Sequence, residues 1–226
     1  MTNQGAPTSL RVGVSRIGLL FILVLALAGC GGGERITETR QVAPFSRLQV
    51  SESVDVKVVP GDGRQVRVYA GENVIDRVLT ASSGGVLEVD IHDRGIVIGP
   101  DPLGDVEVEV QASALEGVDI EGAGDVVLEG LDAPQLELEL QGAADLDASG
   151  TVDQLTASIE GAGNANLLDL RARTARVIVE GAGDAELNVS EELDVSVEGA
   201  ADVSYTGDPR VRSDVSGAGE IRRIEP

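Results

Sequence analysis

The sequence predicts an all-β protein built largely as a parallel β-solenoid, with coils of about 18–20 residues after an irregular β-rich first half. Three observations predict it: a short Gly-Ala motif that recurs six times, a nearly constant spacing of its copies, and an apolar period of two between them. Successive first glycines are 20, 19, 20, 18 and 18 residues apart. Such a fixed period is typical of a solenoid, in which no single repeat buries its own apolar face. The copies are Gly122–Asp125, Gly142–Asp145, Gly161–Asn164, Gly181–Asp184, Gly199–Asp202 and Gly217–Glu220.

The residues between these turns indicate two short strands per coil. Before each turn, apolar and polar side chains alternate, so one row faces a core and the other faces water. Examples are Leu136, Leu138 and Leu140, which alternate with acidic or amide residues. The glycines permit a positive φ or a close backbone approach at a corner, and a second strand such as Asp184–Val189 follows. Stacked coils would pair equivalent strands in parallel. A meander of antiparallel hairpins is the alternative, and the single period favours the solenoid.

The N-terminus is predicted to be a lipoprotein signal peptide, residues 1–29. After two arginines comes an apolar run, Ile17–Ala28, which is too short to span a bilayer as a helix. It ends in Leu27–Cys30, a small-residue motif that resembles the bacterial lipobox. The resemblance implies cleavage before Cys30, diacylglycerol on its thiol, and a fatty-acyl chain such as palmitate on its amine. An ordinary secretory signal with an incidental cysteine is the alternative. Cys30 is the only cysteine, so an intrachain disulfide is impossible.

Residues 30–44 are expected to hold the lipidated cysteine and a flexible tether. Three glycines follow Cys30, and a short polar lead comes next. No aspartate directly follows the cysteine, which resembles export to the outer membrane in Gram-negative bacteria. The expected location is therefore the cell envelope, with a lipid anchor to the membrane, and the outer membrane in a Gram-negative cell.

The composition and charge limit the classes of partner that this protein is expected to bind. Residues 1–29 contain two arginines and no acidic residue, so their removal changes the formal net charge from −22 to −24. A surface this acidic argues against nucleic acid and against electrostatic docking to anionic lipid, and it favours cation uptake. Tryptophan is absent and only two Tyr and two Phe are present, so a high-affinity sugar groove built on aromatic platforms is not supported.

Residues 45–104 are expected to form the irregular β-rich half, and residues 105–226 the solenoid. Val66–Tyr69 follows a turn rich in Pro and Gly and suggests a hairpin or a tight coil. Glu72–Leu79 has mixed periodicity, compatible with a short helical turn. Residues 94–104 carry two prolines and are expected to be a loop.

A solenoid exposes unpaired strand edges at its two ends. The irregular half is expected to cap one end. At the other, Glu220–Pro226 carries charges and a proline, which fits a blunt end; a frayed tail is the alternative.

Several motifs together resemble a known family. These are Phe45–Ser51 followed by Val54–Val56, then Gly71–Ile75, and the repeated Gly-Ala-Gly-Asp turn. They are similar to the bacterial head-GIN domain family, also called the putative auto-transporter adhesin or DUF2807 family, over roughly residues 40–224. The resemblance implies a right-handed β-helix-like fold, an adhesin role and, in many members, a lipoprotein. It supplies no catalytic residues.

The sharpest candidate site is an acidic ladder. Equivalent residues of successive coils would stack about 4.8 Å apart. Like charges at that spacing repel by roughly 1 kcal/mol per pair in bulk water. Bound Ca²⁺ could relieve the repulsion, since carboxylates are its preferred ligands. The alternative is that each aspartate hydrogen-bonds the backbone of its own turn. The ladder consists of Asp125, Asp145, Asn164, Asp184, Asp202 and Glu220, and the residues before each turn are Glu121, Gln141, Glu160, Glu180, Glu198 and Ser216.

No catalytic residue and no cofactor site is predicted. His92 is the only histidine, so a zinc site or a Cys/His nucleophile has no partners, and a structural or exposed role is favoured. Arg171, Arg173 and Arg176 form a basic cluster that is expected to pair with neighbouring acidic rows; an anion site is the alternative.

The leading hypothesis is a non-enzymatic, lipid-anchored envelope protein that displays its solenoid for adhesion or interaction. Its ligand would be an unidentified protein or glycan, and an oligomer is compatible with the sequence. One alternative is a carbohydrate-active enzyme on a β-helix scaffold, which rests on analogy of fold alone. The other is a Ca²⁺-dependent structural protein of the envelope.

Overall fold

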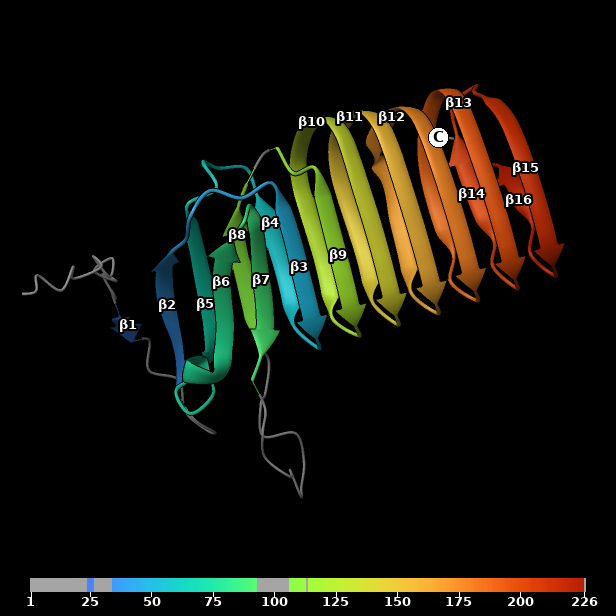
Figure 1. Ribbon diagram of the computed structural model, residues 1–226. Coiled ribbons are helices and arrows are strands. Elements are labelled where there is room, and N and C mark those ends of the chain that lie inside the picture. Colours follow the sequence, from blue (N-terminus) through green and yellow to red (C-terminus); the bar gives the residue numbers. More distant parts are fainter. Residues whose placement is uncertain (1–23, 27–33, 93–105, 113, 226) are drawn as a thin grey trace, which may run out of the picture.

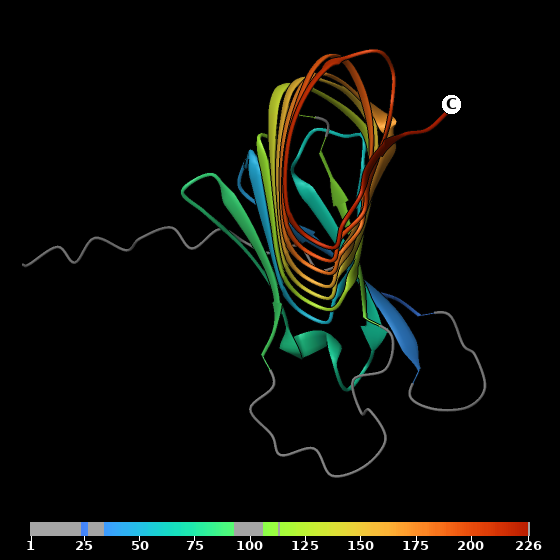
Figure 2. The same cartoon turned by 90° about the vertical axis from the view of Figure 1, so that its right-hand side faces the viewer.

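The structure, a computed structural model, describes residues 24–26, 34–92, 106–112 and 114–225. The coils stack along one axis, with the N-terminal strands at one end and the C-terminal strands at the other (Figure 1). Viewed along that axis, the successive coils overlie one another as nested ovals (Figure 2). About five regular coils occupy residues 117–223, which confirms the all-β solenoid.

Each of four regular coils contributes one long, bent strand to two walls of parallel sheet, and the last coil contributes two shorter strands. In those four coils the structure differs from the expected two separate strands, because the extended backbone continues through the second corner with only a register shift. One such shift lies between Leu128 and Leu131, beside Gly130, whose φ is 63°. The strands are β9 (Gly117–Gly122), β10 (Asp125–Gly142), β11 (Asp145–Gly161), β12 (Asn164–Gly181), β13 (Ala185–Gly199), β14 (Val203–Thr206), β15 (Arg210–Gly217) and β16 (Ile221–Arg223).

The register joins equivalent residues of neighbouring coils. Leu138 pairs with Ala157, Ala157 with Val177, and Val177 with Val195. All four are buried between the two walls. The alternation read from the sequence is therefore confirmed, because the apolar row fills the core of every coil and the polar row faces out.

The first half of the chain extends both walls. Wall 1 consists of the residues that precede each Gly-Ala corner, and β3 (Arg47–Glu52) joins it in parallel with β9. Wall 2 consists of the residues that follow each corner, and β4 (Asp55–Val59) joins it in parallel with β10. Thus β3 and β4 form a coil in register with the regular ones, a continuity that the sequence had not indicated.

Antiparallel strands complete the N-terminal end. In wall 2, β8 (Glu107–Gln111) lies between β4 and β5 (Gln65–Gly71). The expected hairpin or tight coil at Val66–Tyr69 is therefore wrong, because β8 takes the place beside β4. Beyond β5 lies β2 (Arg35–Gln41). In wall 1, β7 (Val86–Ile91) pairs with β3 and β6 (Val78–Ser83).

Two other segments of this half can be compared with what the sequence led us to expect. The helical turn expected within Glu72–Leu79 is confirmed by the 3₁₀ helix η1 (Ile75–Arg77). The polar lead expected within residues 30–44 is instead largely strand β2. The backbone of β2 pairs with β5 along its whole length, so residues 35–41 are not part of a flexible tether.

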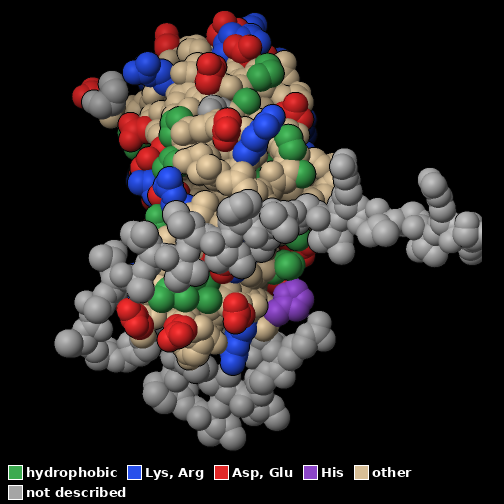
Figure 3. Space-filling model, turned by 90° about the vertical axis from the view of Figure 1, so that its left-hand side faces the viewer, with side chains coloured by type: hydrophobic (Ala, Val, Ile, Leu, Met, Phe, Trp, Pro, Cys, Tyr) green, Lys and Arg blue, Asp and Glu red, His purple; other side chains and the backbone are tan. Residues whose placement is uncertain are grey.

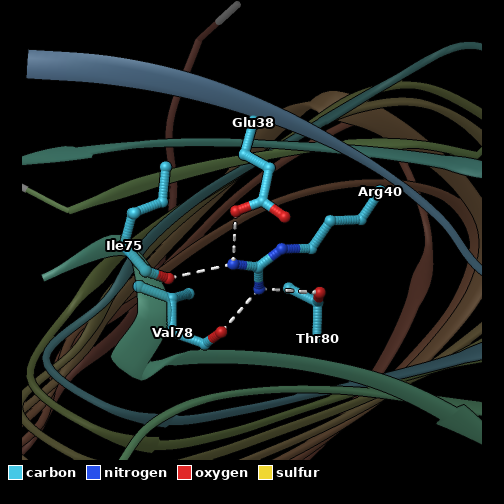
Figure 4. Close-up of polar contacts among 5 residues, drawn as sticks. All are labelled: Glu38, Arg40, Ile75, Val78 and Thr80. Atoms are coloured by element: carbon cyan, nitrogen blue, oxygen red, sulfur yellow. Dashed lines mark hydrogen bonds and ion pairs between the residues drawn. The ribbon is translucent and has the colours of Figure 1, made fainter. Parts of the chain in front are cut away.

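A polar cap closes the N-terminal end of the core (Figure 4). Glu38 and Arg40 lie in β2 opposite Val68 and Val66, which are fully buried. Arg40 donates to the carbonyl oxygens of Val78 at 2.5 Å and Ile75 at 2.9 Å. It also donates to the Glu38 carboxylate at 3.1 Å, and both side chains are 13% exposed. One guanidinium therefore ties β2 of wall 2 to β6 of wall 1 and to η1.

The C-terminal end of the core is left open by the described residues. In β15, Val211 and Val215 occupy inward positions, opposite Leu193 and Val197 of β13. They are 37% and 41% exposed. In β16, Arg223 occupies an inward position and pairs with Asp208 at 3.0 Å. Because β16 pairs with β14, residues 221–223 are not a frayed tail.

The predicted signal peptide lies mostly outside the described residues, as do Cys30, the loop at 94–104 and the boundary near 104. Within the predicted apolar run, β1 (Val24–Ala26) pairs with β2. Among the described helices, none has the length and apolar character that crossing a bilayer would need.

Candidate functional site at the acidic corner

The Gly-Ala corner is where the chain passes from wall 1 to wall 2. Its first glycine has φ between 118° and 141° in the regular coils, a region that side chains rarely adopt. A Cβ on Gly181 would lie 2.1 Å from the carbonyl oxygen of Gly161 in the preceding coil. The alanine that follows donates its N–H to that same stack of carbonyls, as from Ala182 to Gly161 at 2.8 Å. Glycine is therefore required because the corners are in direct backbone contact.

The third corner position points into the core and takes only small residues in the regular coils. Ala144 and Ala201 occupy it in two coils and are 1% and 0% exposed. Glycine occupies it in the others, as at Gly163 and Gly183. No positive φ is found at these two glycines.

The aspartate ladder, which we define as Asp55, Asp125, Asp145, Asn164, Asp184, Asp202 and Glu220, follows the corner. The structure stacks these residues on one edge of wall 2, as the period predicts for Asp125 to Glu220, and adds Asp55, which the sequence had not indicated. The Oδ1 atom of Asp184 accepts the backbone N–H of Asp202 at 2.9 Å, and Oδ1 of Asp202 accepts that of Glu220 at 2.9 Å. Asn164 plays the same part for Asp184, at 3.2 Å.

This geometry corrects the structural interpretation of the ladder. The aspartates were expected to hydrogen-bond the backbone of their own turn. Asp55, Asp145, Asp184 and Asp202 instead accept the N–H of the equivalent residue in the next coil, so each of these four joins two coils. Asn164 also donates from Nδ2 to Oδ1 of Asp145 at 2.8 Å, which relieves repulsion at that step.

Calcium at the ladder stays a prediction. A groove of about 310 Å³ runs along it, lined by Asn164, Ala165, Asn166, Asp184, Ala185, Glu186, Asp202, Ser204 and Arg222. Within the described ranges, no group of three or more His, Cys, Asp or Glu side chains is arranged to hold a metal ion.

A second acidic row lies on the other side of the corner. We call it the glutamate column and define it as Glu121, Gln141, Glu160, Glu180 and Glu198. Register places Gln141 beside Glu160, Glu160 beside Glu180, and Glu180 beside Glu198. All are exposed. No ion pair found among the described residues involves these glutamates.

Asp119 lies one step away from this column, on the outer face of β9. Register places it between Gln49 of β3 and Glu139 of β10. One of its carboxylate oxygens is buried and lacks a hydrogen-bond partner within the described part of the chain. Desolvation, followed by the charges of Glu139 and Glu121, raises the pKa of Asp119, while Arg47 opposes the shift. The carboxylate is therefore easier to protonate than an ordinary aspartate.

The other residues singled out in the sequence have ordinary surroundings. Arg173 pairs with Glu191 at 2.9 Å, and Arg176 lies 3.9 Å from Asp194, which confirms for both the expected pairing with acidic rows. Arg171 is exposed on β12. His92 is exposed at the rim of the N-terminal end, 3.8 Å from Asp90, on a surface where acidic and basic side chains are mixed (Figure 3).

Sequence reasoning missed the first corner. Glu52, with φ 64°, takes the place of the first glycine, and Val54 takes the buried third place. Asp55 begins the ladder, since its Oδ1 accepts the N–H of Asp125 at 3.1 Å. The glycine signature is absent here, but Val54–Val56 keeps the small motif of an inward residue, an aspartate and an apolar residue. That motif could have revealed the coil.

A mixed-charge groove beside this first corner was also missed. It has a volume of about 330 Å³ and lies where β2, β4, β8 and β10 meet. Lys57 binds Glu129 at 2.8 Å, and this hydrogen bond and charge raise the pKa of Lys57. Arg35 pairs with Glu107 at 3.1 Å. The groove is lined by Arg35, Asp55, Val56, Lys57, Glu107, Asp125 and Val127.

The fold and its corner define a parallel β-solenoid protein whose coils are joined by a stack of glycine carbonyls and an aspartate ladder. The family model described as "Putative auto-transporter adhesin, head GIN domain" (DUF2807) matches residues 44–209. The chain therefore belongs to this family. No curated protein matches the sequence.

Solved structures share the fold. A putative adhesin from Bacteroides fragilis is 21% identical, with a TM-score of 0.70, covering 84% of this chain and 97% of its own. A protein from Parabacteroides distasonis described as a putative lipid binding protein is 16% identical, with a TM-score of 0.57 and coverage of 86% and 98%. A putative adhesin from the same organism is 16% identical, with a TM-score of 0.56 and coverage of 85% and 98%.

Proposed function

We propose that this chain is a non-enzymatic protein of the cell envelope, anchored by lipid on Cys30, whose solenoid acts as an adhesin-type interaction module. The glutamate column carries the proposal. Its carboxylates are exposed, lie in three successive coils at Glu160, Glu180 and Glu198, and form no ion pair with any described residue, whereas the ladder beside it is engaged between coils. Membership of a family described as adhesins supports the same function.

The column favours a ligand that is cationic or reached through bound cations. A flat row of carboxylates about 4.8 Å apart attracts repeated positive charge, and it does so most strongly at low ionic strength. A basic protein segment fits this description directly, and an acidic glycan fits it only through a bridging cation such as Ca²⁺.

The ligand test is binding of the chain to whole cells, extracellular-matrix proteins and a glycan panel, each with calcium and with chelator. Glu160→Gln with Glu180→Gln should weaken saturable binding. A matched pair of exposed substitutions elsewhere, Asp132→Asn with Asp169→Asn, should not. Equal binding by both pairs, or no binding across the panel, contradicts an adhesive role for the column.

The anchor test is separate. Cys30→Ser should abolish incorporation of labelled palmitate and release the protein from washed membranes, and Gly32→Ala should leave both unchanged. A Cys30→Ser protein that stays in the washed membrane fraction contradicts the lipid anchor and leaves the ligand test unaffected.

A further inference from the structure

The open end of wall 1 is an edge strand with an apolar row. β15 pairs with β13 on one side, and no described strand pairs with its other side. All eight of its residues are exposed. In the coil before it, the equivalent positions are covered by β15, and Leu193 and Val197 are 0% and 1% exposed. An exposed edge with apolar side chains is a template for another strand.

The sequence of β15 is complementary to itself when reversed. In an antiparallel pair centred on Ser213, Val211 of one strand faces Val215 of the other. Arg212 then faces Asp214, and Arg210 faces Ser216. We propose that the open end of wall 1 docks onto a second copy of this chain through this pairing, so that the two solenoids join head to head about a twofold axis.

The proposed pairing makes favourable contacts on both faces of the edge strand. On the inner face, the two Val211–Val215 contacts would cover valines that are otherwise 37% and 41% exposed. On the outer face, the twofold axis repeats each Arg212–Asp214 contact, and opposite charges directly across an antiparallel pair are favourable. Arg212 already pairs with Glu192. A guanidinium has five donors, so it can keep that partner and reach Asp214 of the second copy.

The other strand edges do not offer the same match. The inward residues of β6 at the N-terminal end include Thr80 and Ser82, opposite Val89 and Leu87, so a head-to-tail stack would set valines against hydroxyls. In β16, the inward Arg223 is already paired with Asp208, so this short strand presents no apolar row to a second copy. We therefore assign the contact to β15 alone, which makes it small and its affinity modest.

Site-specific cross-linking of the full chain tests the pairing and its register. Cys30→Ser removes the only native thiol, so every cross-link comes from an introduced cysteine. Ser213→Cys places thiols of the two copies directly opposite each other. Val211→Cys places them four residues apart, about 13 Å along the strands, beyond the reach of a disulfide. Val211→Cys with Val215→Cys restores an opposed pair.

The expected result is several-fold more covalent dimer under mild oxidation with Ser213→Cys than with Val211→Cys, and recovery of the dimer with the double variant. Equal cross-linking by the two single variants would indicate random collision and overturn the register. Absence of cross-linking together with a monomeric mass in light scattering would overturn the dimer.

A charge exchange gives a second readout on the outer face, where the fold is least disturbed. Asp214→Arg alone should lower the dimer fraction, because Arg would then face Arg212. Adding Arg212→Asp should restore it. Thermal unfolding of each variant checks that the solenoid is intact, and a dimer fraction unchanged by Asp214→Arg contradicts the proposed pairing.

Discussion

Each of the four residues in the repeated corner motif has its own structural role. The first glycine provides a backbone conformation and a place for the neighbouring carbonyl. The alanine donates to that carbonyl, the third residue fills a small space in the core, and the aspartate accepts an N–H from the next coil. The motif therefore connects neighbouring coils. The same residue types recur in successive corners because equivalent residues of neighbouring coils are in contact.

The two glycines of one corner should respond differently to alanine. Gly181→Ala forces a side chain to φ 136° and against the Gly161 carbonyl, so we expect a loss of roughly 2 kcal/mol or more in the free energy of unfolding. Gly183→Ala also needs a backbone shift, but Ala144 and Ala201 show that this corner position accommodates alanine. Denaturant unfolding of both variants measures the difference, and a Gly183→Ala loss as large as that of Gly181→Ala contradicts this assignment.

The ladder should tolerate an amide and not an alanine. Asp184→Ala leaves the N–H of Asp202 without its acceptor and should cost about 1 kcal/mol of unfolding free energy. Asp184→Asn keeps the acceptor, as Asn164 does in the native ladder, and should stay within about 0.5 kcal/mol of the wild type. If both substitutions destabilise equally in denaturant titrations, charge rather than hydrogen bonding sets the role of Asp184.

Because of Asp119, the free energy of unfolding should increase as the pH falls toward the usual range of aspartate pKa values. Its folded-state pKa is raised, so the folded chain binds the proton first, and the favourable contribution is lost as pH rises through the folded pKa. Asp119→Asn should therefore raise the melting temperature at pH 7 by about 1–2 °C. The gain is small because solvent screens the charge of this partly exposed carboxylate, and it should vanish at acidic pH. A gain that is constant between pH 7 and pH 4 argues against a titrating Asp119.

Among the elements, the coil is the unit that sequence reasoning captured best. The spacing of Gly122, Gly142 and Gly161 predicted the parallel register, because equivalent residues of a solenoid contact each other at each turn. The same reasoning failed at Glu52, where an αL backbone replaces the glycine conformation and removes the signature. It also failed at β8, because the order of strands across a sheet depends on long-range packing that local alternation does not encode.

Removal of one whole coil should preserve the fold. Deletion of residues 142–160 joins Gln141 to Gly161 and lets β12 take the register of β11 against β10, so we expect a cooperative, shorter solenoid. Deletion of residues 142–159 is the control, since the extra residue places Glu160 where the corner glycine belongs and reverses the faces of the strand. Circular dichroism and thermal unfolding distinguish them; comparable folding of both would contradict strict register.

The candidate site was only partly accessible from the sequence. The period located the ladder correctly, but its direction of hydrogen bonding depends on how coils are offset in space. The exposed glutamate column was recognised only as the row before each turn, because whether a carboxylate has an ion-pair partner depends on neighbours in adjacent coils. Glu137, in the same wall, does have one, Arg47, at 3.0 Å.

At the scale of the whole molecule, the described residues form one closed and one open end of the stack, and the closed end depends on Arg40. Arg40→Ala removes the donor to Ile75, Val78 and Glu38 and should lower the free energy of unfolding by about 2–3 kcal/mol, because it leaves a largely buried carboxylate without its partner. Arg35→Ala, on the same strand, loses only the exposed pair with Glu107 and should cost less than about 0.5 kcal/mol. Chemical unfolding of the pair tests the cap, and equal losses would contradict it.

The coils are interchangeable in register, so the length of the molecule is adjustable without redesign of its cross-section. Each added or removed coil changes the distance between the two ends by about 4.8 Å. For a protein held to a membrane near β2, the number of coils would then determine how far from the bilayer the open end of β15 is presented. Variation in repeat number could therefore tune reach independently of what the surface binds.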